Sequence, residues 1–270
     1  MAIRDFGSRM HILNWAEGQG GDLVTTLNEM LEPTRVVVSP SSFWMPISRN
    51  QPDEAVPFRS CPKLFDPTIS AAGLRWWLAD PHPNGQTPNI DFAATATFPD
   101  GRAGLVFAEA KAHVDELRNE AGGKRPGSMR NHESIGAAIE QAKAWLGGDA
   151  KGVRISRDAR YQFANRLAMS CFLAKHDIPV VLIYLGFTGD AGVGTAFRDL
   201  RDWRDQVLDH TRDFFPASWW DNQIPWSGAP LWTLIRCLPC LRQTPPIAVR
   251  RSRANVAQPR NSRQIISDIG

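Results

Sequence analysis

Three ionisable side chains lie on two neighbouring segments that have the residue pattern of β-strands. Asp91 belongs to the first segment, and Glu109 and Lys111 belong to the second. The turn Pro99-Asp100-Gly101 separates them, because proline presets the first corner, aspartate fits the second and glycine closes a three-residue hairpin loop. Counting back from that loop places Asp91 opposite Glu109, and the two-residue period of a strand puts Lys111 on the same face.

This convergence of charges suits a divalent metal ion. Two carboxylates side by side repel and raise each other's pKa unless a cation neutralises them. Mg2+ prefers carboxylate and carbonyl oxygens, so Asp91, Glu109 and the Ala110 carbonyl are the expected ligands, with Mn2+ as the alternative ion. The Lys111 ammonium would steady an attacking water and offset charge that builds on phosphate oxygens. The expected chemistry is metal-dependent hydrolysis of a phosphodiester.

A Glu-x-Lys triplet arises about once by chance in a chain of this length, so the triplet alone is weak evidence for a site. Its place in the predicted hairpin is the stronger evidence. Asp149-Ala150-Lys151 has an equivalent spacing, but it lies among glycines with no strand to align its side chains. The alternative for Asp91, Glu109 and Lys111 is an ordinary hairpin whose charges face water. The predicted pairing and the apolar residues that lead into Glu109 favour the site.

Asp91 and Glu109-Ala110-Lys111 resemble the signature of the PD-(D/E)XK, or restriction-endonuclease-like, nuclease superfamily, and the resemblance covers about residues 66–187. It implies an α/β fold with a mixed sheet flanked by helices. A helix precedes the hairpin that carries the motifs, and a helix and a further strand follow it. The first motif departs from the family, because Pro88-Asn89-Ile90-Asp91 replaces a Pro-Asp pair, so only Asp91 is carried over. Some members have lost catalysis, so the resemblance implies a chemistry rather than a biological task.

The same resemblance implies supporting residues. A carboxylate from an earlier segment often joins the site, and Glu54 is the first candidate, with Glu29 behind it. A polar helper often comes from the helix after the hairpin, where Gln141 is the first candidate. His113 shares the predicted face of Glu109, so it is either a ligand or proton shuttle, or a rim histidine without a catalytic role.

A polar cluster near the start of a later predicted helix is a further candidate. Gln162, Asn165 and Arg166 interrupt a helix whose other residues are mostly apolar. Their amide and guanidinium groups could support the site, with Gln162 as the named helper, or grip a phosphate. Capping and surface hydrogen bonds explain them equally well.

The rest of the chain supplies the elements that position these residues. Hydrophobic periodicity and turn residues predict a strand over 178–185 that is buried on both faces, as in a central parallel strand. The helix over 132–146 is expected to pack on the sheet. The other predictions are a helix over 22–32, a strand over 35–38, a helix capped by Asp66 and ended by Pro81, a helix over 158–176 and a surface helix over 197–214.

The chain is expected to form one nuclease-like core with additions at both ends. Residues 1–65 are predicted to be an N-terminal elaboration, and 66–241 the core with an aromatic-rich C-terminal segment. The tryptophans of that segment are more typical of packing than of base stacking. The tail 242–270 is expected to be basic and disordered.

Charge and hydropathy limit the partners. The net charge is +3, yet six arginines and one aspartate lie beyond position 241, so the body is slightly negative. That balance argues against a broad phosphate-binding surface and leaves a local basic rim possible. The first residues lack the apolar stretch of a signal peptide, and the longest apolar run, 178–187, is too short to span a bilayer. We expect a soluble, cytoplasmic protein with no membrane partner.

Four cysteines are too few for a disulfide framework in a chain of this length. Cys237-Leu238-Pro239-Cys240 has the spacing of half a zinc or redox motif, but no second pair or suitably spaced histidine follows it. We therefore interpret these two cysteines as structural, and Cys61 and Cys171 as reduced residues.

Two functional hypotheses follow. The first is a Mg2+-dependent nuclease, endonuclease or exonuclease, that acts on nucleic acid, with DNA as the expected partner. The second is a catalytically inactive relative that binds nucleic acid or protein. A metal hydrolase of small phosphoesters would use the same ligands and differ in pocket size.

Overall fold

The computed structural model describes most of the chain, and the predicted tail over 242–270 lies outside the described residues, as does Cys61. The described residues are 7–19, 21–56, 58, 63–81, 87–120, 122–123, 127–190, 192 and 194–240.

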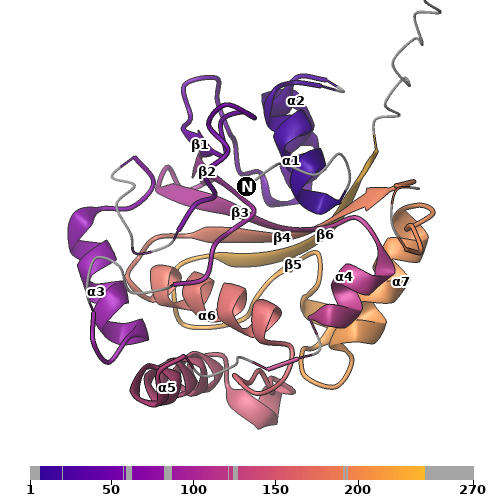
Figure 1. Cartoon of the computed structure of the whole chain (residues 1–270). Coiled ribbons are helices and arrows are strands. Elements are labelled where there is room, and N and C mark those ends of the chain that lie inside the picture. Colours follow the sequence, from indigo (N-terminus) through magenta and orange to yellow (C-terminus); the bar gives the residue numbers. More distant parts are fainter. Residues whose placement is uncertain are drawn as a thin grey trace, which may run out of the picture.

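A six-stranded mixed sheet, in the order β1-β2-β3-β4-β6-β5, forms the centre of the fold (Figure 1). β2 pairs antiparallel with both β1 and β3. β3, β4 and β6 run parallel to one another, and β5 pairs antiparallel with β6. The strands are β1 (Trp44–Met45), β2 (Phe92–Thr97), β3 (Ala103–Lys111), β4 (Val180–Thr188), β5 (Asn222–Gln223) and β6 (Leu231–Pro239).

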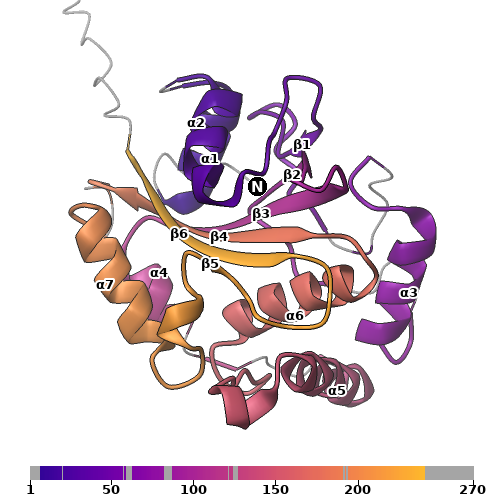
Figure 2. The same ribbon diagram turned by 180° about the vertical axis from the view of Figure 1, so that it is seen from behind.

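Helices cover both faces of this sheet. α1 and α2 lie on one face, and α3, α4, α6 and α7 lie on the other, with α5 outside α6 (Figures 1 and 2). The helices are α1 (Ser8–Ala16), α2 (Leu23–Leu31), α3 (Pro67–Trp77), α4 (Val114–Asn119), α5 (Met129–Trp145), α6 (Tyr161–Lys175) and α7 (Leu200–Thr211). Three short 3-10 helices are η1 (Glu32–Thr34), η2 (Gly148–Lys151) and η3 (Ala217–Trp219).

Side-chain alternation along the central strands creates two cores. Leu105 and Phe107 of β3 face the core under α3 and α6, whereas Val106 and Ala108 face the core under α1 and α2. β4 contributes to both cores in the same way, as predicted for a strand with helices on both sides. The expected α/β class with a mixed sheet flanked by helices is confirmed.

The predicted hairpin register is confirmed. Phe92 pairs with Ala108, and the ladder runs from there to Thr97 opposite Ala103. The loop closes as its residue types require, because the N–H of Gly101 (φ 84°) donates to the Phe98 carbonyl at 2.9 Å. Asp91 therefore lies one residue beyond the last ladder pair, on the face that Glu109 occupies.

The predicted helix cap at Asp66 is confirmed, since the Asp66 carboxylate accepts hydrogen bonds from the first N–H groups of α3. Asp22, which was predicted to begin a helix, caps α2 in the same manner. The expected strand over 35–38 is wrong, because only Val37 forms an isolated bridge, with Thr97. The expectation that α5 packs on the sheet is also wrong, since α5 packs mainly against α3 and α6.

The aromatic-rich C-terminal segment belongs to the fold itself. Its strand β6, which the sequence did not predict, lies beside β4 near the middle of the sheet. Its four tryptophans pack against the two cores, which supports the packing interpretation. They are Trp219, Trp220, Trp226 and Trp232. In the part of the chain that the structure describes, no helix has both the length and the apolar character that a membrane crossing requires.

Candidate active site

The three predicted site residues meet where β3 ends and β2 begins. Glu109 and Lys111 point to the same face of β3, and only 1% and 4% of their surfaces are exposed. Asp91, which is partly buried, extends its carboxylate across to β3, where Oδ2 accepts a hydrogen bond from the Ala110 N–H at 2.8 Å. The Asp91 side chain thus accepts a β3 hydrogen bond one step beyond the last backbone pair of β2 and β3.

Glu109 is held by two cations. Its Oε1 is 2.5 Å from the Lys111 ammonium, and its Oε2 accepts a hydrogen bond from Arg166 Nε at 2.7 Å. Burial raises the pKa of Glu109, but the charges of Arg166 and Lys111 outweigh it and hold the pKa below its ordinary value. A metal ion was the expected source of the neutralising charge. Arg166, which comes from α6, supplies a further positive charge.

Asp91 is the less compensated carboxylate of the pair. Burial and then the negative charge of Glu109 raise the pKa of Asp91 to about 6. Of the described residues, none places a lysine, arginine or histidine nitrogen within ion-pair distance of this carboxylate. The carbonyl of a β-residue points to the same side as its N–H, so the Ala110 carbonyl lies beside Asp91. Two oxygen ligands for a hard cation are therefore adjacent at this position.

Lys111 is fixed in its charged form. Its Nζ lies 3.2 Å from Gln162 Oε1 and 4.0 Å from Glu120 Oε1, in addition to its contact with Glu109. Burial lowers the pKa of Lys111, but the surrounding carboxylates raise it above its ordinary value. A protonated ammonium cannot serve as a general base at neutral pH. It can donate hydrogen bonds and compensate negative charge.

A buried extension of the site was not predicted. Tyr184, which pairs with Glu109 across the β3–β4 ladder, donates its hydroxyl to Glu120 Oε1 at 2.7 Å. The other carboxylate oxygen of Glu120 is 3.3 Å from His210 Nε2 on α7. The one available signal was the position of Tyr184 on a strand predicted to be central. The sequence alone carried no signal for Glu120.

An open pocket of about 650 Å³ borders the site. Its wall includes Asp91, Gln162 and Arg166, together with Glu54 from the N-terminal segment. The Glu54 carboxylate accepts a hydrogen bond from Asn89 Nδ2 at 2.8 Å and pairs with Arg9. Glu109 and Lys111 lie behind this wall. The pocket therefore gives a ligand direct access to Asp91 and Arg166 first.

The structure brings together some of the predicted residues and separates others. Gln162 and Glu54 join Asp91 at the pocket. Gln141 does not, because α5 lies outside α6 and the Gln141 amide oxygen accepts a hydrogen bond from Trp76 Nε1 at 2.6 Å. His113 lies beyond the end of β3, with Nε2 3.5 Å from Glu116 Oε1. Glu29 is exposed on α2, across the sheet from the pocket.

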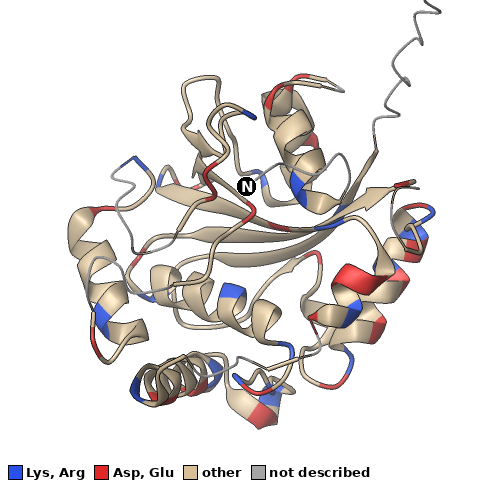
Figure 3. Ribbon diagram, viewed as in Figure 1, with Lys and Arg blue, Asp and Glu red and all other residues tan. Residues whose placement is uncertain are grey.

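The helices α5 and α7 carry charges of both signs. Figure 3 shows acidic and basic residues spread over α5 and α7, whereas the strands are largely uncharged away from the ends of β2 and β3. A mixed surface of this kind gives weak long-range attraction for a polyanion.

Comparison with known proteins gives no match, whether with protein-family models, with curated proteins or with solved structures. The case for a function therefore rests on the geometry of the site.

Proposed function

We propose that this chain is a Mg2+-dependent nuclease of the PD-(D/E)XK type that hydrolyses phosphodiester bonds in DNA. The observation that carries the proposal is the convergence of Asp91, Glu109 and Lys111 beside an open pocket. The order of elements supports it, since α3 precedes the β2–β3 hairpin, α5 and α6 follow, and β4 then pairs parallel to β3.

The residues at the end of β3 fit a hard divalent cation. The Asp91 carboxylate forms no ion pair with the residues described, and burial together with the negative charge of Glu109 raises its pKa despite the nearby charges of Lys111 and Arg166. Asp91, Glu109 and the Ala110 carbonyl would hold Mg2+, leaving further positions for water and phosphate oxygen. The ion would act as a Lewis acid and lower the pKa of a bound water.

Lys111 and Arg166 would act on the substrate without changing their protonation. Lys111 is oriented by Glu109 and Gln162, so its ammonium can hold the attacking water and offset charge on the phosphate. Arg166 lines the pocket, and its Nη2 forms no hydrogen bond with the residues described. That free donor edge suits a phosphate oxygen.

The alternative is an inactive module that binds nucleic acid or protein. One observation favours it: Glu109 is almost fully buried and already neutralised by Lys111 and Arg166. In that case the charges form a structural network, and the protein has no need of a metal.

Cleavage assays with a matched control separate the two functions. The substrates are single- and double-stranded DNA and RNA, each with Mg2+ or Mn2+. Lys111→Ala should lower the cleavage rate by at least about 100-fold, because it removes a positioned charge from the transition state. Lys151→Ala removes the lysine of the Asp149-Ala150-Lys151 triplet outside the site and should leave the rate unchanged.

Metal binding measured by calorimetry completes the test. Asp91→Ala should abolish Mg2+ binding by the folded protein if the nuclease proposal is right. A folded protein that cuts none of the substrates, and whose metal binding is indifferent to Asp91, would establish the inactive module instead.

A further inference from the structure

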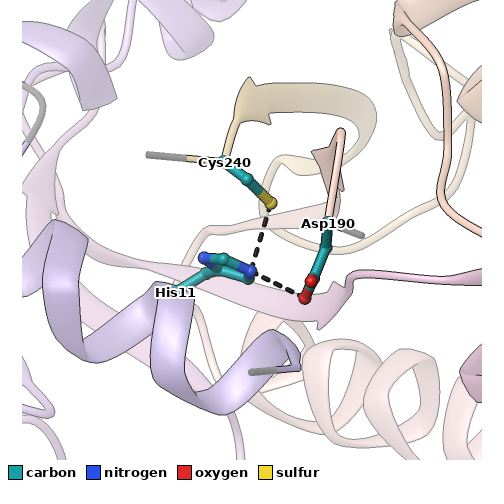
Figure 4. Close-up of side chains that lie close together, drawn as sticks. All are labelled: His11, Asp190 and Cys240. Carbon is teal, nitrogen blue, oxygen red and sulfur yellow. Dashed lines mark hydrogen bonds and ion pairs between the residues drawn. The ribbon is translucent and has the colours of Figure 1, made fainter. Parts of the chain in front are cut away.

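A second group of metal-ligating side chains lies on the opposite side of the sheet from the candidate active site. His11 Nε2 is 2.9 Å from Asp190 Oδ2 and 3.1 Å from Cys240 Sγ. The three atoms lie within 4.8 Å of one another. Figure 4 shows the three side chains converging from α1 and from the segments that follow β4 and β6.

The topology explains why residues so distant in sequence meet here. β4 and β6 are parallel neighbours whose last paired residues are Thr188 and Pro239, so the residues that follow both strands emerge at the same edge. The Cys240 N–H donates to the Thr188 carbonyl at 2.8 Å and extends this pairing. α1 packs on the same face of the sheet and places the His11 ring 5.1 Å from the ring of Phe187.

Asp190 is positioned in advance by backbone hydrogen bonds. Its Oδ1 accepts from the Gly192 N–H at 2.8 Å, and its Oδ2 accepts from the Gly7 N–H at 3.1 Å. His11 and Asp190 expose only 5% and 6% of their surfaces. An oriented carboxylate thus faces a buried imidazole and a thiol.

The geometry differs from that of a catalytic triad. In a nucleophile–histidine–carboxylate relay, the carboxylate holds one ring nitrogen and the nucleophile uses the other. Here Asp190 and Cys240 both approach Nε2 of His11. Three donor atoms directed at one point are instead the pattern of a coordination site.

We propose that His11, Asp190 and Cys240 bind one divalent ion of the zinc class. Imidazole, thiolate and carboxylate are the ligands that Zn2+ uses in proteins, whereas Mg2+ selects oxygen. Ligand atoms around a tetrahedral Zn2+ lie about 3.3–3.6 Å apart. The observed separations from His11 Nε2 therefore require only a small outward shift.

A fourth ligand would be a water molecule. A pocket of about 50 Å³ borders His11, which is sufficient for one water molecule, and its lining combines apolar side chains such as Trp15 with the polar side chains of Asn14, Gln19 and Thr26. Cys237 does not supply the fourth ligand, because it packs against the other core. The bound ion would tie α1 to the ends of β4 and β6. This site is independent of the proposed nuclease chemistry, which uses the opposite face and a harder ion.

Cobalt spectroscopy of the full-length protein tests the proposal. The protein is stripped with a chelator and titrated with Co2+, then with Zn2+. We expect one equivalent to bind with a thiolate-to-cobalt charge-transfer band, which Zn2+ abolishes. Cys240→Ser should remove the band and weaken Zn2+ binding at least about 100-fold. Cys237→Ser changes a cysteine three residues away on the other face of the sheet and should retain both.

A measurement on the unaltered chain covers the case in which Cys240→Ser does not fold. Zn2+ should slow alkylation of Cys240 by iodoacetamide, read by peptide mass spectrometry, and leave Cys237 unaffected. Absence of the charge-transfer band in the folded wild-type protein would overturn the proposal. Equal loss of the band in both serine variants, or equal protection of both cysteines, would overturn the ligand assignment.

Discussion

Replacing Arg166 with methionine tests whether two cations hold Glu109 as a buried anion. Methionine keeps most of the volume of the arginine stem and removes the guanidinium that donates to Glu109 Oε2. Glu109 retains Lys111, but its second oxygen loses its partner at a position that is 1% exposed. Breaking one side of a buried ion pair costs about 3 kcal/mol. For a chain of this size, that loss lowers Tm by roughly 6 °C.

A surface arginine provides the matched control. Arg102, like Arg166, forms ion pairs with carboxylates, in this case those of Asp100 and Asp177, but its side chain is 35% exposed. Arg102→Met should therefore cost less than about 1 kcal/mol. Urea unfolding at neutral pH measures both changes. If the two methionine variants lose the same small amount of stability, Glu109 is not a buried anion, and the charge argument for the site fails.

The pH dependence gives the same test a definite sign. The pKa of Glu109 is depressed below its ordinary value of 4.5, so its ion pairs contribute stability above about that pH. The contribution is lost as the pH falls through the folded-state pKa. The difference between wild type and Arg166→Met should therefore be largest near neutral pH and shrink below pH 4.5. A difference that grows as the pH falls would contradict the assignment.

Two further substitutions probe the same network. Asp91 has a pKa raised from 3.8 to about 6, so its ionisation destabilises the fold as the pH rises through that window. Without metal, Asp91→Asn should therefore raise the free energy of unfolding by up to about 3 kcal/mol at pH 7.5 and leave it unchanged at pH 3. Urea unfolding measures both values. Equal effects at both pH values would refute the raised pKa. Tyr184→Phe removes the hydroxyl that donates to buried Glu120, which should cost about 1–3 kcal/mol in thermal unfolding and leave Mg2+ binding by calorimetry unchanged.

Features determined by a few consecutive residues were predictable from the sequence. The turn at Pro99-Asp100-Gly101 determines the β2–β3 register, and the register places Asp91 beside Glu109. The cap of α3 follows from Asp66 alone, because a carboxylate before a helix satisfies its first N–H groups. These predictions needed no knowledge of the rest of the fold.

Features that depend on the packing of distant segments were not predictable. Arg166 was recognised as unusual, but its partner Glu109 lies 57 positions earlier, and only the placement of α6 over β3 joins them. β6 was missed because its final residues, which include Arg236 and Cys237, are half-buried and do not form an apolar run. His11 and Cys240 are 229 positions apart, and local spacing carries no signal for their contact.

The net charge of the candidate active site couples the binding of a metal ion to the binding of a phosphate. Glu109, Asp91 and Glu120 face the cations Lys111 and Arg166, so the cluster has a formal charge of −1. Adding Mg2+ brings this to +1, and adding one phosphodiester brings it to zero. A buried cluster is least costly when its charges cancel. Under the proposed function, metal and phosphate therefore bind best together, because the ion would share the neutralisation of Glu109 with Lys111 and leave Arg166 available to the phosphate.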